Sequence, residues 1–490
     1  MRERKGLLSK TQYMDGLACP GFLWFSIHNK EKDTTPDLMT VHLMEQGAAV
    51  GELARTLYPD GINALATEDG DTAADTLKLL EHRKTIFEAG FVAGELYARV
   101  DILVPAGKES WDIIEVKGVT QIDDSHIQDC AFQKYVCENA GLKVRKVFLL
   151  YVNKDYIKKG GIDPRKLLIL EDVTNDVGKE QDGIKERIGT VLAAATAKRK
   201  PTPSIELAGC NPKECPYTDE CIGELSDDSV FFLYRAGAKA KQMYARGIKK
   251  IGQIPKKEKL TANQAIQAEC DKNSTVHMDK KVIKKFLSLL KEPVYYMDFE
   301  TYAETIPRFD GMKPNQNITF QFSVHVLDKG QLIHHSYLAP CDMDPRPEFL
   351  KRLKAVLGTM GSIVVYNQSF EQSRLKELGE QFPEYQEWIS TLDDRYVDLL
   401  LPFRAFGFYD PAQKGSASIK KVLPAVTGKS YEGMSVSNGG DASVMYYRAV
   451  TGRLGKAETK KLRANLEESC GLDTEGMVWI VEKLRGMGDS

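Results

Sequence analysis

Residues 97–118 read YARVDILVPAGKESWDIIEVKG, and this stretch decides the fold of the first part of the chain. Two apolar runs, 100–104 and 113–116, flank a turn that contains Pro and Gly, which predicts a β-hairpin. A helix candidate at 124–141 (DSHIQDCAFQKYVCENAG) and a strand candidate at 143–153 (KVRKVFLLYVN) follow it. A hairpin followed by a helix and a further strand indicates an α/β core.

The hairpin carries a set of charged side chains. Asp101 lies on its first strand, and Glu115 and Lys117 lie two residues apart on the second, so these two share one face. Two carboxylates and a lysine suit metal-assisted phosphodiester hydrolysis: the carboxylates hold Mg²⁺ or Mn²⁺, the metal activates a water molecule and the lysine orients that water. The alternative interpretation is a solvent-facing strand edge with alternating charge.

The nine cysteines are an odd number, and we expect no disulfide framework. Cys210, Cys215 and Cys221 fall within twelve residues, whereas Cys19 lies near the start of the chain. Four thiolates from the two ends of one domain can ligate a 4Fe-4S cluster or a Zn²⁺ ion. The remaining cysteines are expected to be plain buried thiols: Cys130, Cys137, Cys270, Cys341 and Cys470.

With a lone cysteine, the acidic hairpin, a glutamine-bearing helix and a cysteine trio in this order, the first 222 residues resemble the RecB-like PD-(D/E)XK nucleases with an iron–sulfur cluster. The CRISPR-adaptation nucleases and the AddB type belong to this group. The resemblance implies a restriction-endonuclease-like core with these catalytic and cluster-binding residues: Asp101, Glu115, Lys117, Cys19, Cys210, Cys215 and Cys221. The family has a metal-binding His upstream of the hairpin. At the corresponding position this chain reads GAAVGE, so Glu52 is the expected metal ligand. Gln133, in CAFQKYV, is carried over as the helix glutamine.

A second acidic set begins at VYYMDFET (294–301), an apolar strand candidate with Asp298 and Glu300 on one face. Buried like charges so close together are costly unless a cation neutralises them, so the pattern predicts a metal site. Glu371 lies at a strand-to-helix junction, and Asp473 lies in a helix candidate, where it could also be an N-cap. The strand candidates 318–327, 331–339 and 362–370 and the helix candidates 347–358 and 370–382 indicate a second α/β domain.

These carboxylates resemble the acidic motifs of the DnaQ-like (DEDD) exonucleases of the RNase H-like fold. The resemblance implies that Asp298, Glu300, Glu371 and Asp473 hold two metal ions about 4 Å apart. Glu371 stands where Asp is usual, and Glu468 and Ser469 stand where the family places a His or a Tyr. With GSASIKKVLPAV and SNGGDAS between the last two acidic motifs, nearly the whole chain also resembles an uncharacterised bacterial family of unknown-function domains.

Residues 229–291 are strongly basic, with fifteen Lys or Arg against four Asp or Glu in a chain whose net charge is −2. This block predicts a helical module that faces a polyanion, and the alternative is a solvated helical surface. Within it, YARGIKKIGQIPKK (244–257) resembles a helix-hairpin-helix element, whose Gly-containing turn presents backbone N–H groups to a phosphate. Four lysines would add backbone contacts to nucleic acid: Lys249, Lys250, Lys256 and Lys257.

The composition, 42 % apolar and 28 % charged over 490 residues, excludes a disordered or fibrous chain. No apolar run approaches the ~18 residues of a membrane helix, and MRERKGLLSK lacks the apolar stretch of a signal peptide, so we expect a cytoplasmic protein without a membrane partner. Three parts are expected: a PD-(D/E)XK domain (1–222), a basic helical module (223–291) and an RNase H-like DEDD domain (292–490).

We therefore expect a metal-dependent nuclease that uses Mg²⁺ or Mn²⁺. The resemblances imply exonucleolytic cleavage of single-stranded or end-containing DNA, with DNA favoured over RNA. The alternative is a nucleic-acid-binding protein with one active PD-(D/E)XK site and a degenerate, non-catalytic RNase H-like domain. In both cases the four-cysteine site is expected to hold a 4Fe-4S cluster, with Zn²⁺ as the alternative.

Overall fold

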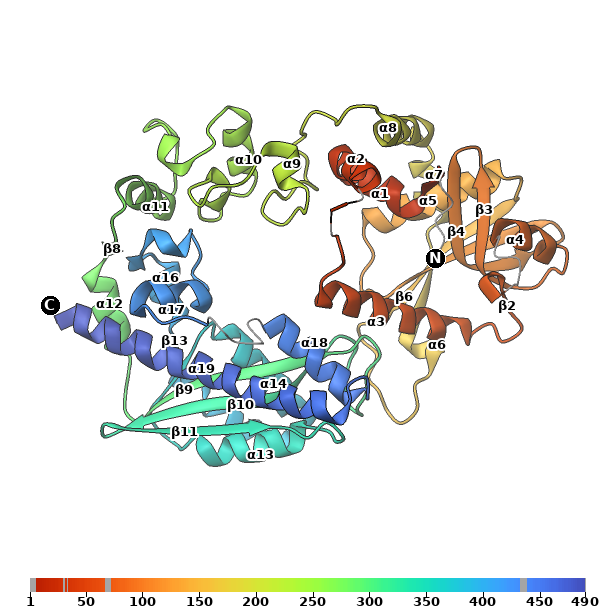
Figure 1. Ribbon diagram of the computed structural model, residues 1–490. Helices are drawn as coiled ribbons and strands as arrows, with labels where there is room; N and C mark the ends of the chain where they lie inside the picture. The colour runs from red at the N-terminus through yellow and green to blue at the C-terminus, as the bar shows by residue number, and fades with distance from the viewer. Residues whose placement is uncertain (1–5, 30, 33, 67–71, 432–438, 490) are drawn as a thin grey trace. The chain divides into compact units, whose positions relative to one another are not determined.

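The structure is a computed structural model that describes residues 6–29, 31–32, 34–66, 72–431 and 439–489 (Figure 1). It is a mixed α/β structure, as predicted, and it divides into two compact units. Unit 1 comprises Met1–Glu224 and Glu304–Gln316, and unit 2 comprises Leu225–Ala303 and Asn317–Ser490. The chain therefore passes between the units three times. Residues 1–5 of MRERKGLLSK and 437–438 of SNGGDAS lie outside the described residues.

Unit 1 is built on a seven-stranded sheet in the order β2-β3-β4-β5-β6-β7, with β1 paired to β4. Its strands are β1 (Leu8–Ser9), β2 (Ile62–Asn63), β3 (Ile86–Ala93), β4 (Leu96–Ala106), β5 (Ser110–Lys117), β6 (Val144–Val152) and β7 (Leu168–Asp172). Its helices are α1 (Lys10–Ala18), α2 (Pro20–His28), α3 (Leu38–Arg55), η1 (Ala64–Ala66), α4 (Thr72–Leu80), α5 (Asp124–Asn139), α6 (Pro164–Leu167), α7 (Thr174–Glu180), α8 (Ile184–Thr196) and α9 (Thr218–Ile222).

The predicted hairpin, helix and strand are β4–β5, α5 and β6. β4 and β5 are antiparallel, and the α5 crossover makes β6 parallel to β5. The carboxylate of Asp123 caps α5 by accepting hydrogen bonds from the backbone N–H groups of Ser125 and His126. Several apolar residues of α5, among them Phe132 and Val136, are fully buried against the sheet. This packing fixes the helix over the strands that carry the predicted acidic residues.

Unit 2 is built on a five-stranded sheet in the order β11-β10-β9-β12-β13, with a two-stranded β8–β14 ribbon apart from it. Its strands are β8 (His277–Met278), β9 (Val294–Ala303), β10 (Asn317–Asp328), β11 (Gln331–Leu338), β12 (Ser362–Val365), β13 (Tyr396–Asp398) and β14 (Phe408–Tyr409). Its helices are η2 (Val230–Phe232), α10 (Ala238–Ala245), η3 (Ile251–Gln253), α11 (Ala262–Asn273), α12 (Lys280–Leu287), α13 (Arg346–Val356), α14 (Ser369–Gln381), η4 (Pro383–Tyr385), α15 (Gln386–Ser390), η5 (Asp393–Arg395), α16 (Leu400–Arg404), η6 (Pro411–Gln413), α17 (Ile419–Thr427), α18 (Gly439–Val450) and α19 (Lys456–Asp489).

The sheet of unit 2 has β9 at its centre. β9, β10 and β11 form an antiparallel meander, whereas β12 is parallel to β9 and β13 is parallel to β12. The long helix α19 packs against β9 and β10, and α13 packs against β10 and β11 (Figure 1). The predicted strands and helices between residues 318 and 382 are β10, β11, β12, α13 and α14. β9 is therefore covered by a helix that crosses from the far end of the sequence.

The basic segment differs from the expected helix-hairpin-helix element. α10 is followed by a turn in which Gly247 has a φ of +88°, but the next element, η3, is a three-residue 3₁₀ helix. Pro255 explains this difference, because a residue before proline is disfavoured in the α region, and Ile254 is extended with a ψ of 121°. The segment therefore contains short helices, but not the expected pair of α-helices around the turn.

Residues Glu304–Gln316, the connection between β9 and β10, belong to unit 1. The backbone N–H of Thr305 donates to Oε1 of the buried Gln46 at 3.0 Å. The Lys158 ammonium pairs with Asp310 at 2.7 Å, and Ile306 packs on an apolar cluster of unit 1. A connection of the second sheet is thus an integral part of the first unit.

Candidate metal centres

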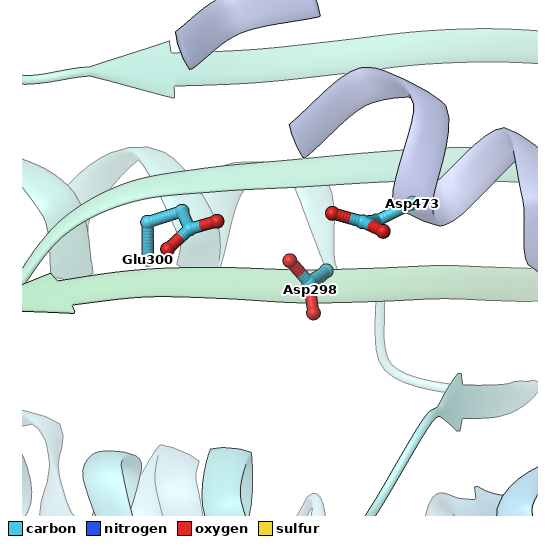
Figure 2. A group of neighbouring side chains, drawn as sticks. All are labelled: Asp298, Glu300 and Asp473. Atoms are coloured by element: carbon cyan, nitrogen blue, oxygen red, sulfur yellow. The ribbon is translucent and has the colours of Figure 1, made fainter. Parts of the chain in front are cut away.

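Three carboxylates of unit 2 converge above the central strand. Asp298 and Glu300 project from β9, and Asp473 projects toward them from α19 (Figure 2). Their ligand oxygens lie within 4.8 Å of one another, and within the described ranges this is the one group of three or more His, Cys, Asp or Glu side chains that converges so closely. Hard carboxylate oxygens in this arrangement suit Mg²⁺ or Mn²⁺.

The electrostatics of this acidic cluster are unfavourable without a cation. Burial raises the pKa of Asp298 well above its usual range, and the charges of Asp473, Glu300 and Glu371 raise it further. Burial and the charge of Asp473 raise the pKa of Glu300 to about 8. Carboxyl groups that hold protons near neutral pH would release them to a divalent cation, so the donor set fits a metal.

Glu371 lies in the first turn of α14, directly after β12, and is 2 % exposed. Its Oε2 atom is buried and has no hydrogen-bond partner. Burial, followed by the charge of Asp398, raises the pKa of Glu371 to about 8. The charge of Glu371 raises the pKa of Asp298, so the two side chains are neighbours. Glu371 nevertheless lies outside the group of three carboxylates whose oxygens are within 4.8 Å of one another. An orphaned buried carboxylate oxygen beside three others is a further donor for a cation.

Three further side chains approach the acidic cluster, and the first is Cys470, whose buried thiol donates a hydrogen bond to Oδ2 of Asp298 at 3.7 Å. The Tyr431 hydroxyl donates a hydrogen bond to Oδ1 of Asp473 at 2.7 Å. Lys420, on α17, lowers the pKa of both Glu300 and Asp473 against the larger, opposite effect of burial. Sequence reasoning sought a tyrosine or histidine at positions 468 and 469, and no local spacing identifies Tyr431, which precedes Asp473 by 42 residues. Lys420 lies in the quoted IKKVLP motif, but no role was assigned to it.

The predicted site of unit 1 is brought together around Glu115. Lys117 Nζ lies 2.9 Å from Glu115 Oε1, and Gln133 Nε2 lies 2.8 Å from Glu115 Oε2. Asp101, on the neighbouring strand, accepts a hydrogen bond from the backbone N–H of Val116 at 2.8 Å. All four residues predicted from the hairpin and its following helix therefore lie at one site.

The two acids of this site titrate in opposite directions. Burial, followed by the negative charge of Glu115, raises the pKa of Asp101 to about 8. Burial also acts to raise the pKa of Glu115, but Lys10 and Lys117 outweigh it and hold the pKa of Glu115 below its usual range. Burial and the neighbouring charge thus disfavour ionisation of Asp101, whereas the two lysines favour ionisation of Glu115.

Two residues that sequence reasoning missed complete this site. Lys10 Nζ lies 2.6 Å from Glu115 Oε1 and 3.5 Å from Asp129 Oδ2. Asp129 also accepts hydrogen bonds from Lys117 and, at 3.0 Å, from Gln133. Asp129 precedes Gln133 by four residues on α5, and this helical spacing could have identified it. Lys10 has no such signal, because it lies about 100 residues from its partner.

Glu52, the expected upstream metal ligand, is linked to this site only through Arg55, which pairs with both Glu52 and Glu88. Its side chain is 70 % exposed on α3 and pairs with Arg55 at 2.9 Å. Glu88 approaches Asp101 instead and contributes to raising its pKa. It has a φ of +57° and lies between the β3–β4 pairs Phe87–Ile102 and Ala89–Val100, opposite Asp101. A left-handed backbone at one residue, which the sequence pattern does not reveal and which leaves the strand register unchanged, thus accompanies the acidic neighbour.

The four predicted cysteines line one cavity of about 320 Å³ in unit 1: Cys19, Cys210, Cys215 and Cys221. Cys19 is both the C-cap of α1 and the N-cap of α2, and its Sγ accepts a hydrogen bond from the backbone N–H of Phe22 at 3.4 Å. Tetrahedral Zn–S bonds of ~2.3 Å would place the sulfurs about 3.8 Å apart. Among the described residues, no three of these sulfurs approach within 4.8 Å.

The remaining cysteines are free thiols. Cys130, Cys137, Cys270 and Cys470 are buried, as predicted, whereas Cys341 is only half-buried. The four lysines predicted to contact nucleic acid are all exposed: Lys249, Lys250, Lys256 and Lys257. Lys250 also pairs with Asp228 at 3.1 Å. Exposure leaves both the polyanion-facing and the solvated-surface interpretations of this segment open.

Comparison with known proteins gives relatives without a stated activity. Residues 295–418 match the family described as "Domain of unknown function (DUF2779)". The chain is similar to "Uncharacterized protein MG366 homolog" of Mycoplasma pneumoniae, with 28 % identity over 236 residues (41 % of this chain, 34 % of the relative). It is also similar to "Uncharacterized protein UU173" of Ureaplasma parvum, with 29 % identity over 190 residues (34 % of this chain, 27 % of the relative).

The chain thus spans only about a third of the length of the curated relatives it matches. Among solved structures, the one titled "Crystal structure of SSO0001" matches 46 % of this chain and 90 % of its own, with 13 % identity and a TM-score of 0.23. A likeness this low carries no argument about fold or function. In the described part of the chain, every helix is too short or too polar to span a membrane.

Proposed function

We propose that the chain is a metal-dependent nuclease that hydrolyses phosphodiester bonds at two acidic sites, one in each unit. The observation that carries this proposal is the convergence of the Asp298, Glu300 and Asp473 carboxylates within 4.8 Å of one another. Closely spaced buried carboxylates repel one another and lose hydration, which costs free energy. A divalent cation bound between them offsets that cost.

In the site of unit 2, four carboxylates would hold the cations: Asp298, Glu300, Glu371 and Asp473. Bound Mg²⁺ or Mn²⁺ would polarise the phosphate and lower the pKa of a bound water molecule. The Tyr431 hydroxyl holds Asp473 in position and stands where a hydroxyl can also orient that water. Lys420 adds a positive charge beside Glu300 and Asp473, which favours binding of an anionic phosphodiester.

In the site of unit 1, Asp101 and Glu115 would hold the cation. Gln133 fixes the orientation of Glu115 through a 2.8 Å hydrogen bond. Lys117 places its ammonium on the same face, where it orients a water molecule or offsets charge on the phosphate. The order of Asp101, Glu115, Lys117 and Gln133 along a hairpin and the next helix supports a PD-(D/E)XK core for unit 1.

For unit 2, the proposed fold is RNase H-like with a DEDD set. Its support is the placement of the acids on the central strand β9, on the helix after β12 and on the helix α19 that covers β9. The four-cysteine cavity is proposed to hold a 4Fe-4S cluster, with Cys19 from the start of unit 1 and the other three from its end. Bound there, the cluster would join the two ends of the unit.

The proposed substrate is single-stranded or end-containing DNA, cleaved exonucleolytically in the cytoplasm. The exposed lysines of the basic segment would contact the phosphate backbone. Two observations support an active second site over the degenerate alternative. Three of its acids lie within 4.8 Å of one another with Glu371 near Asp298, and the Tyr431 phenol contacts Asp473, whereas positions 468 and 469 hold Glu and Ser.

The test is a cleavage assay on the full, anaerobically purified chain with Mg²⁺ or Mn²⁺. DNA and RNA oligonucleotides labelled at either end are incubated with the wild type, Asp298→Asn, Lys117→Met and the double variant. The controls are Glu467→Gln, an exposed acid on α19, and Lys146→Met, a lysine that pairs with Asp172 away from the site.

We expect metal-dependent ladders that each single variant reduces and the double variant abolishes. Activity lost in Lys117→Met but unchanged in Asp298→Asn would show that only unit 1 is catalytic. Salt-sensitive DNA binding without cleavage in any metal would refute the nuclease and favour a binding protein.

A further inference from the structure

The carboxylate of Glu115 is contacted by two lysines, whereas the hydrolytic site proposed for unit 1 uses only one. Lys117 reaches Oε1 from the same strand at 2.9 Å, and Lys10 reaches the same oxygen from α1 at 2.6 Å. The other oxygen, Oε2, accepts the Gln133 amide at 2.8 Å. Both oxygens of the acid that would hold a cation are therefore already engaged, and the second ammonium needs an explanation.

Lys10 is held at this site by the backbone around it. Ser9 and Gln12 form a capping box that starts α1 at Lys10. Directly before it, Leu8 and Ser9 pair with Leu96 and Tyr97 on β4, the strand that carries Asp101. The start of α1 is thus anchored to the sheet, and the Lys10 side chain, 25 % exposed, reaches inward to Glu115, which is 2 % exposed.

The charges at the site balance in this arrangement. The ammonium groups of Lys10 and Lys117 lie against the carboxylates of Glu115 and Asp129. A lysine side chain is ordinarily charged at neutral pH, so each carboxylate faces a positive charge. A divalent cation bound to Glu115 would place two further positive charges beside an ammonium that lies 2.6 Å from the ligand oxygen, and the repulsion between them opposes binding.

We propose that Lys10 is an internal counter-cation that occupies the position beside Glu115 and competes with the divalent cation for it. The proposal rests on the proposed metal site of unit 1. Without metal, Lys10 keeps the buried Glu115 and Asp129 paired, which avoids uncompensated buried charge. When a cation binds, Lys10 leaves Glu115 and keeps only its weaker contact with Asp129. Lys10 thereby sets the metal concentration at which the site fills.

The test measures Mn²⁺ binding to the full chain by the loss of the free-ion EPR signal. Asp298→Asn and Asp473→Asn are present throughout, so that only the site of unit 1 contributes. In this background Lys10→Met is compared with the parent, with Lys10→Arg and with the matched control Lys146→Met. We expect Lys10→Met to bind Mn²⁺ about tenfold more tightly, and the other two variants to bind like the parent.

Unchanged or weaker binding in Lys10→Met, with normal binding in the parent, would overturn the Lys10 proposal alone. Absence of Mn²⁺ binding in every variant would instead refute the metal site itself. A purely structural role for Lys10 would weaken binding, so it cannot produce the expected gain in affinity.

A second measurement uses the unaltered chain and does not depend on whether a variant folds. The rate at which an amine-reactive ester labels Lys10 is followed by mass spectrometry with and without Mn²⁺. If Mn²⁺ frees the ammonium from Glu115, Lys10 will label several-fold faster, while Lys146 will not change. An unchanged labelling rate at Lys10 under saturating Mn²⁺ would refute the competition.

Discussion

At the scale of single residues, Tyr431 contributes a hydroxyl to the acidic cluster of unit 2. We expect Tyr431→Phe to slow cleavage by this site about 10- to 100-fold, because Asp473 loses the donor that holds it and misplaced catalytic groups cost rates of this order. The measurement is single-turnover cleavage in a Lys117→Met background, where unit 1 is silent. Tyr385→Phe, whose ring packs against Trp388, is the control. Equal cleavage rates for Tyr431→Phe and Tyr385→Phe would show that Tyr431 has no role in cleavage.

The raised pKa values of Glu300 and Glu371 predict how pH affects stability. Each group keeps its proton in the folded state up to about pH 8, whereas the unfolded chain releases it near pH 4.5. Between these values the folded state binds more protons, so the free energy of unfolding of the metal-free protein falls as pH rises, by up to ~1.4 kcal/mol per pH unit and group.

We therefore expect Glu371→Gln to lessen this fall between pH 5 and pH 8, as measured by thermal unfolding in EDTA. Mn²⁺ should raise the midpoint of unfolding more at pH 8 than at pH 6, because fewer protons must then be displaced. A pH profile that is the same for the variant and the wild type would show that Glu371 is not a protonated buried acid.

The residues that could be predicted are those whose partners lie close in the sequence. Asp298 and Glu300 share a strand face by their spacing of two, and Glu115 and Lys117 do so in the same way. Tyr431 and Lys10 reach their sites from elements 42 and 105 residues away, and only tertiary packing creates these contacts. Glu88 was missed for a different reason, a local departure from regular strand geometry.

At the scale of elements, the cysteine cavity joins three short segments with little regular structure. Cys19 lies between α1 and α2, Cys215 lies in a loop and Cys221 lies on α9. We expect Cys215→Ser to lose iron and to lower the midpoint of unfolding of unit 1, because a bound cluster contributes its binding energy to folding. Iron content and calorimetry on anaerobic protein check this.

Cys341→Ser is the matched control for the cysteine test. Cys341 is half-buried in unit 2 and lies outside the cavity, so its loss should leave the iron content unchanged. If both variants lose iron equally, the assignment of the four ligands is wrong. Stoichiometric zinc, with no iron, would contradict the proposed cluster and favour the alternative of a single Zn²⁺ ion at this site.

Elements were predictable where apolar periodicity was strong, and they were not where one residue decided the backbone. The α5 segment and the strands β4, β5 and β6 follow from their patterns. The basic segment instead had the rhythm of a helical hairpin, but Pro255 limited the element after the turn to a 3₁₀ helix. A proline directly after Ile254 outweighs the helical spacing of the isoleucines.

At the scale of the whole molecule, residues Glu304–Gln316 tie the second sheet to the first unit. Replacing 305–315 with an Asn-Gly turn would keep β9 and β10 joined but remove Ile306 and Asp310 from unit 1. We expect unit 1 to lose about 1–3 kcal/mol of stability. Urea unfolding followed by the fluorescence of Trp24 and Trp111, which both belong to unit 1, in a Trp388→Phe/Trp479→Phe background measures this loss. An unchanged midpoint would show that the segment adds nothing to unit 1.

The same connection affects how this gene can be dissected. A single stop codon anywhere between positions 225 and 303 produces a first fragment that lacks Glu304–Gln316, and the complementary second fragment carries that stretch without its packing partners. An inert amino-terminal fragment would therefore say nothing about whether its catalytic residues work. Inactivating one centre by point substitution in the intact polypeptide, rather than by truncation, is the way to assign an activity to either half.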